Sequence, residues 1–354
     1  MITRRLANML GGVVAGLLVA AGGAGPAMAQ GREPIRITIG YQTLWAAGGE
    51  IFEVLRHTNI LELNGIKGEF RKFTYGGPLG EAAVAGEIDN IYGADAPALR
   101  AAARIPGAKI LHRTHDFRFG IVAQPDFKGG LTDLRGKTVS GPFGTTTFPR
   151  SMEKVMEAGI KSPFSEIRLI NQDIAEQPAA LQAKQVDAVT TWDPTMEKLL
   201  RSGYKPLVIS KPGDDGGGWQ GLSGKWLEKH GEDGAVRFLK AWIMAAWWAS
   251  NNIQQAHQWF AETSRIPVDL LVVSAQADRY LRAPVKDIKT IDYVLDEQTI
   301  KASQRVMDFL HERKLLQEKM DVSQYVDMRY IQRAQREIAE GKHPRLSDIK
   351  IVSN

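Results

Sequence analysis

Short apolar runs alternate with longer segments of helical periodicity through most of the chain. Each short run is rich in β-branched or aromatic side chains, which predicts a strand. The strand candidates are residues 35–39, 70–73, 88–92, 109–111, 117–123, 138–140 and 188–191. Between these runs, apolar side chains recur three and four positions apart, as at Met152, Val155 and Met156, which predicts helices. Such alternation is typical of an α/β fold.

One short pattern occurs twice, in residues 85–97 and 183–194. In each copy a predicted helix ends, a short strand follows, and a polar loop with Asp and Pro opens the next helix. The repetition predicts two lobes that are built alike. Because ligands of open α/β sheets bind beyond the carboxyl ends of the strands, the loops at Asp95 and Asp193 would frame one cleft. Both aspartates also suit helix caps, with Pro194 as the first helical residue after Asp193.

The N-terminal segment is typical of an export signal. Arg4 and Arg5 precede an apolar run at residues 9–24, and Ala27–Ala29 suits cleavage. We therefore predict a signal peptide at residues 1–29, with the Sec and Tat routes both open. The mature chain of about 325 residues exceeds what one hydrophobic core usually supports, which also favours two lobes.

The order of the predicted elements divides the mature chain. The second lobe is expected at residues 119–211, so the first lobe would be discontinuous, at 30–118 and 212–354. Helical segments are predicted at 235–250, 256–262 and 297–315, and they would pack on the first lobe.

Three consecutive threonines, Thr145, Thr146 and Thr147, stand where a glycine-rich loop leads into a predicted helix. Unpaired backbone N–H groups, the positive end of the helix dipole and hydroxyl donors converge at such a position. The segment predicts a site for a small oxyanion, whereas ordinary helix capping would need only one of the three hydroxyls.

Further candidates lie on the other loops of the predicted cleft. Trp45, Trp192 and Trp219 can cover the apolar part of a ligand or anchor their loops, whereas the tryptophans within helices, at 242, 247, 248 and 259, are expected in the core. The candidate ligand-binding residues are Gln42, Thr43, Leu44, Trp45, Gly77, Asp95, Thr145, Thr146, Thr147, Trp192, Asp193 and Trp219.

Composition narrows the classes of function. The chain has no cysteine, which excludes disulfides, thiol catalysis, thiolate metal sites and a lipid-attachment cysteine. Its net charge of +5 is spread over interspersed acidic and basic residues, so nucleic-acid binding is not expected. Gly136–Thr138 lacks the first glycine of a P-loop, and His112 and His115 lack the glutamate of a zinc-protease helix. These histidines are expected at the surface or at a lobe contact. No catalytic residue, metal or cofactor is predicted.

With these motifs in view, the chain resembles the periplasmic solute-binding proteins of the nitrate, sulfonate and taurine type, which serve ABC importers. The segments that carry the resemblance are residues 86–89, 131–139, 142–147 and 186–194. The resemblance implies a type II periplasmic binding fold, with two α/β lobes, two crossing segments and a ligand cleft between the lobes. It also implies a monomeric, periplasmic protein without a lipid anchor, which binds a small organic anion and delivers it to a permease and its ATPase.

Residues 43–45 and 214–219 depart from the family pattern, so the ligand stays open. Binders of thiamine precursors and of aromatic compounds share the fold. An exported enzyme on this fold and a sensory or adaptor module are further alternatives.

Overall fold

The structure is a computed structural model, and it describes residues 33–211 and 217–352. The predicted signal peptide and residues 214–216 lie outside the described part. The strands are β1 (Ile35–Gln42), β2 (Ile66–Phe73), β3 (Asn90–Ala94), β4 (Lys109–Arg113), β5 (Phe119–Ala123), β6 (Thr138–Gly141), β7 (Arg168–Asn171), β8 (Ala188–Trp192), β9 (Lys205–Ile209) and β10 (Gly218–Leu222).

Helices separate most of these strands, as the sequence predicts. They are α1 (Gly48–His57), α2 (Ile60–Leu63), α3 (Gly76–Val84), α4 (Asp95–Arg104), α5 (Thr147–Ala158), α6 (Pro163–Glu166), α7 (Gln177–Gln182), α8 (Thr195–Arg201), α9 (Gly224–Asn251), α10 (Ile253–Ser264), α11 (Val268–Ala275), α12 (Glu297–Glu312) and α13 (Arg329–Ala339). None of the helices in the described part of the chain has the length and apolar character that a membrane-spanning helix needs.

We call the part built on β1–β4 and β10 the first lobe. Strand β1 pairs in parallel with β2, and β10 runs antiparallel between β3 and β4. Side chains join β1 to β3, because the N–H of Thr38 donates to Asp89 Oδ2 at 2.7 Å and the N–H of Gly40 donates to Asn90 Oδ1 at 2.7 Å. The spatial order β2-β1-β3-β10-β4 follows from these contacts.

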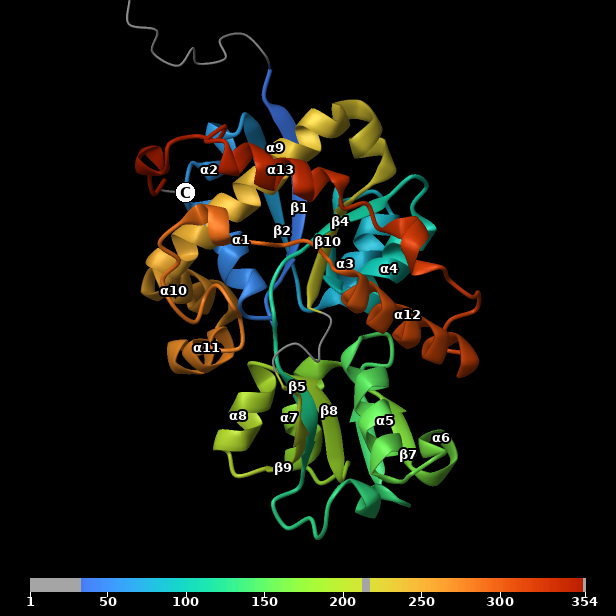
Figure 1. Ribbon diagram of the computed structural model, residues 1–354. Coiled ribbons are helices and arrows are strands. Elements are labelled where there is room, and N and C mark those ends of the chain that lie inside the picture. The colour runs from blue at the N-terminus through green and yellow to red at the C-terminus, as the bar shows by residue number, and fades with distance from the viewer. Residues whose placement is uncertain (1–32, 212–216, 353–354) are drawn as a thin grey trace, which may run out of the picture. The chain divides into compact units, whose positions relative to one another are not determined.

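We call the part built on β5–β9 and α5–α8 the second lobe. Its sheet has the order β7-β6-β8-β5-β9, with β6 parallel to β7 and β8, and β5 antiparallel to β8 and β9 (Figure 1). The N–H of Thr138 donates to Asp187 Oδ2 at 2.7 Å, as that of Thr38 does to Asp89. The units α3–β3–α4 and α7–β8–α8 therefore confirm the predicted repeat.

The C-terminal helices divide between the two lobes. Helices α9 and α13 share the hydrophobic cluster of the first lobe, as expected. Helix α12 differs from the expectation, because it contacts α4 of the first lobe and α5 of the second, and Phe309 belongs to a hydrophobic cluster of the second lobe. Residues 34–354 form one compact unit, and the predicted lobe boundaries remain a prediction.

Candidate functional site

A small cavity lies where the two lobes meet at the carboxyl ends of their strands. Its volume is about 20 Å³. The lining residues come from the ends of β1, β3 and β8, from the loop after β1, from the first turns of α3 and α4, from the segment before β5, and from the residues that lead into α5. They are Gln42, Trp45, Gly76, Ala94, Pro97, Phe117, Thr145, Thr146, Thr147 and Trp192. Six of the twelve predicted residues thus line one cavity.

Helix α5 meets the cavity with its N-terminus. The hydroxyl of Thr145 donates to the carbonyl of Pro142 at 2.7 Å, and that of Thr146 donates to Asp95 and accepts from the N–H of Ala96 at 3.1 Å. Within the described part of the chain, the hydroxyl of Thr147 has no such internal partner. Pro149 has no N–H and the N–H of Arg150 donates to the carbonyl of Thr146 at 3.3 Å, so the first-turn N–H groups without a partner inside α5 are those of Thr147 and Phe148. Two hydroxyls therefore position the helix, and Thr147 with the backbone N–H groups faces the cavity.

Two tryptophans form further walls. Trp45 is 4% exposed, its Nε1 has no hydrogen-bond partner among the described residues, and its ring lies 4.2 Å from His115 and 5.0 Å from Phe117, between centroids. Trp192 lies at the end of β8 and donates from Nε1 to the carbonyl of Leu44 at 3.2 Å. Trp192 of the second lobe is thus hydrogen-bonded to the first lobe, whereas Trp45 keeps a buried donor beside the cavity.

Asp95 joins the lobes and does not line the cavity. Its carboxylate is fully buried, lies 3.0 Å from Arg150 Nη2 and accepts from the hydroxyls of Thr146 and Ser303, the latter at 2.6 Å. It also accepts from the N–H of Ala96 at 2.8 Å, but the predicted cap is wrong, because α4 begins at Asp95 itself and Ala94 is its N-cap. Because Arg150 compensates the carboxylate, Asp95 places little net charge beside the cavity.

Asp193 lies outside the cavity. Its carboxylate accepts from Arg118 Nε at 2.6 Å, burial raises its pKa, and Arg118 opposes that rise. The predicted cap is displaced by one residue, because α8 begins at Thr195 with Pro194 as its N-cap and a cis bond precedes Pro194.

The four other predicted residues from the first lobe differ in whether they line the cavity. Gln42 lines the cavity and donates from Nε2 to the carbonyl of Tyr92 at 3.4 Å, whereas Thr43 is not among the lining residues and its hydroxyl donates to the carbonyl of Phe73 at 3.2 Å. Leu44 contributes its carbonyl to Trp192. Gly77 lies one residue beyond the cavity wall, which Gly76 forms.

Trp219 and the two histidines correct the sequence analysis. Trp219 lies within β10 and is fully buried, because β10 runs between β3 and β4. It therefore lies on no cleft loop. His112 and His115 are also buried rather than at the surface, because β10 and the first-lobe aromatic rings cover them.

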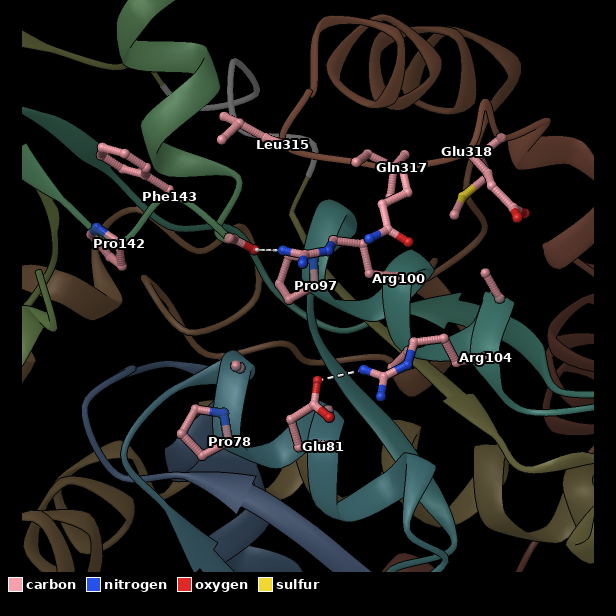
Figure 2. Close-up of a pocket in the computed structure, with 18 of the residues that line it drawn as sticks. Pro78, Glu81, Pro97, Arg100, Arg104, Pro142, Phe143, Leu315, Gln317 and Glu318 are labelled. Carbon is pink, nitrogen blue, oxygen red and sulfur yellow. Dashed lines mark hydrogen bonds and ion pairs between the residues drawn. The ribbon is translucent and has the colours of Figure 1, made fainter. Parts of the chain in front are cut away.

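A larger cleft of about 920 Å³ adjoins the small cavity and shares Gly76 and Pro97 with it. Figure 2 shows Arg100 of α4 reaching the carbonyl of Gly144 in the second lobe, at 3.4 Å, and Arg104 paired with Glu81. Sequence analysis missed Arg100 and Phe117. Arg100 lies in the second turn of a helix whose start was recognised, so its position on the cleft side could have been found from the helical period.

No family model matches the sequence. A putative aliphatic sulfonates-binding protein of Bacillus subtilis (strain 168) is 24% identical over 178 residues, and the match covers 50% of this chain and 50% of that relative. The alkanesulfonate-binding protein SsuA from Xanthomonas axonopodis pv. citri, solved with MOPS, has a TM-score of 0.68 at 21% identity, over 84% of this chain and all of its own. The periplasmic nitrate-binding protein NrtA from Synechocystis PCC 6803 has a TM-score of 0.64 at 15% identity, over 87% of this chain and 89% of its own.

The chain has the type II periplasmic binding-protein fold. Two α/β lobes with a cleft between them, as predicted, are what this fold provides. The same fold also occurs in an enzyme. The desulfurization enzyme DSZB has a TM-score of 0.60 at 14% identity, over 86% of this chain and 99% of its own. The fold alone therefore does not separate binding from catalysis.

Proposed function

We propose that this chain is the extracytoplasmic solute-binding component of an ABC importer. It binds a small organic anion, which is a sulfonate, a taurine-like compound or a related oxyanion, between its lobes and delivers it to a permease driven by an ATPase. The observation that carries the proposal is the cavity at the strand ends of both lobes, where the start of α5, Thr147 and the Trp45 indole offer donors. The relatives described as sulfonate- or nitrate-binding proteins support it.

The donors around the cavity are all neutral. No Lys, Arg or His is among its lining residues in the described chain. Backbone N–H groups at a helix start can hold an anion without a counter-charge. Hydrogen bonds to a charged group contribute about 1.5–3 kcal/mol each, so three or four support micromolar binding after entropy costs.

Binding without turnover is part of the proposal. The cavity lining carries no acid, histidine, lysine or cysteine in the described residues, so no side chain there is suited to act as general base or as activated nucleophile. An exported enzyme would chemically convert its bound ligand, whereas a binding protein releases it unchanged. We further propose that the protein is a monomer in the periplasm, exported by Sec or Tat and free of a lipid anchor.

Thermal melting of the mature protein with a panel of sulfonates, nitrate, carboxylates and pyrimidines tests this function. A ligand at a hundredfold excess over its Kd should stabilise the folded protein by about 2.7 kcal/mol. Recovery of the bound compound unchanged after long incubation is expected. Absence of any shift with every anion, or conversion of the ligand, would contradict the proposal.

A further inference from the structure

Three aromatic side chains line the cavity beside α5 and four smaller or polar residues, and they come from both lobes. Trp45 follows β1 of the first lobe, Trp192 ends β8 of the second, and Phe117 lies just before β5. All three side chains are at least nine-tenths buried. A flat ring placed here would meet indole from either lobe, whereas an alkyl chain would use only part of that surface.

We propose that the ligand is an aromatic monoanion, an arene sulfonate or a close analogue, with its oxyanion at the start of α5 and its ring between Trp45 and Trp192. This inference rests on the proposed function and names the class of ligand. The buried indole N–H of Trp45, which has no partner among the described residues, is a donor from the first lobe for the same oxyanion.

The size of the cavity shows how such a ring enters. A volume of about 20 Å³ holds one water molecule, whereas a cavity that admits benzene is about 150 Å³. The lobes must therefore separate at the walls, and the hydrogen bond from Trp192 to the carbonyl of Leu44 must open. On closure the ring would take the place of the direct contact between the lobes.

The charges around the cavity favour a single, delocalised negative charge. Asp95 and Arg150 compensate each other beside the cavity, and no cation lines it in the described chain. A phosphate dianion would have to lose its hydration without a counter-charge, which is costly. A sulfonate spreads one charge over three oxygens and needs only neutral donors.

Calorimetry with benzenesulfonate, propane-1-sulfonate and phenyl phosphate tests the inference on the mature protein. We expect benzenesulfonate to bind at least tenfold more tightly than either other probe. Trp192→Phe should keep this preference, because a ring remains, and Trp192→Leu should reduce the ratio of benzenesulfonate to propane-1-sulfonate affinity to near one. Should Trp192→Leu fail to fold, the ratio of benzenesulfonate to propane-1-sulfonate affinity in the wild-type protein still decides whether the ligand is aromatic.

Trp45→Phe and Trp247→Phe form a matched pair, because each removes a buried indole N–H without a partner in the described chain, and Trp247 lies on α9 outside the cavity. Trp45→Phe should weaken benzenesulfonate binding at least tenfold, and Trp247→Phe should leave it unchanged. Equal or tighter binding of propane-1-sulfonate would overturn the aromatic inference, and equal effects of the pair would overturn the role of the Trp45 N–H as a donor, while the proposed function stands in either case. Binding of none of the probes, together with a silent melting panel, would overturn the proposed function itself.

Discussion

At the scale of single residues, the three threonines before α5 divide their roles. The hydroxyls of Thr145 and Thr146 already donate within the protein, and Thr147 lines the cavity without an internal partner in the described chain. Thr147→Val should weaken binding of a small sulfonate by about 1.5–3 kcal/mol, because a hydrogen bond to charged oxygen is lost at similar side-chain volume.

Isothermal calorimetry with the tightest ligand of the melting panel measures this loss. Thr145→Val is the control, and it should change affinity little, since its hydroxyl serves the turn at Pro142. If Thr145→Val weakens binding as much as Thr147→Val, the threonines act on the helix start rather than on the ligand.

Sequence reasoning found residues whose role follows from local position and missed roles that depend on distant partners. Thr145–Thr147 and Trp192 stand at strand and helix ends, so the predicted elements placed them near the cavity. The partners of Asp95 were not predictable, because Arg150 and Ser303 are 55 and 208 positions away. Trp219 was misplaced because the glycine-rich run before it resembles a loop that continues through it, whereas strand β10 begins at Gly218.

At the scale of elements, one aspartate in each copy of the repeat joins two strands. Asp187 accepts from the N–H of Thr138 and joins β8 to β6, as Asp89 joins β3 to β1 through Thr38. Asp187→Ala should lower the free energy of unfolding by about 1–3 kcal/mol, because a half-buried N–H loses its acceptor. Urea unfolding measures the change.

Asp133→Ala in the same lobe is the control for that variant. Asp133 accepts from the N–H of Gly130 in an exposed turn, so its loss should cost less than half as much. If both variants lose the same free energy of unfolding, the contact of Asp187 between β8 and β6 stabilises the fold no more than an exposed turn does.

The repeat also shows why the elements were predictable from the sequence, whereas the packing of helix α12 was not. Each copy encodes the end of a helix, a strand and the start of the next helix within one short segment, so local pattern is sufficient to predict it. Helix α12 carries the same kind of amphipathic pattern, but its contacts with α4 and α5 depend on how the lobes meet. A periodic pattern indicates that a face is buried, and it does not indicate against which lobe.

At the scale of the whole molecule, two buried histidines predict sensitivity to acid. Burial lowers the pKa of His112 to about 4 and that of His115 to about 3. Between these values and 6.5 the unfolded chain binds more protons, so stability falls as the pH drops. Burial raises the pKa of Asp278 to about 6, which opposes this trend below pH 6.

From these shifts we expect the free energy of unfolding to fall by roughly 2–3 kcal/mol between pH 7 and pH 5. His115→Gln should remove about 2 kcal/mol of that difference, because glutamine keeps a polar group that does not titrate. Urea unfolding at the two pH values measures both quantities. A pH dependence that is unchanged in His115→Gln would assign the acid sensitivity to other groups.

The contact between the lobes leads to the last prediction. Asp95 of α4 joins α5 through Arg150 and Thr146, and the N–H of Ala96 donates to the same threonine hydroxyl. These bonds favour the closed arrangement before any ligand enters. A ligand shifts the equilibrium further towards closure only if it binds the closed state more tightly than the open state. Both carboxylate oxygens of Asp95 accept hydrogen bonds, so in Asp95→Asn the charge is lost and the amide N–H₂ faces donors in either orientation; breaking such a buried pair costs about 3–5 kcal/mol. The unliganded variant should therefore open, with a larger radius of gyration in small-angle scattering, and a saturating ligand should restore the wild-type value.

Ser303→Ala is the matched control, because it removes a bond to the same carboxylate from α12 and leaves the pair between α4 and α5 intact. It should lower the melting temperature without changing the radius of gyration. If Asp95→Asn lowers the melting temperature at an unchanged radius, the buried pair stabilises the fold and has no part in closure.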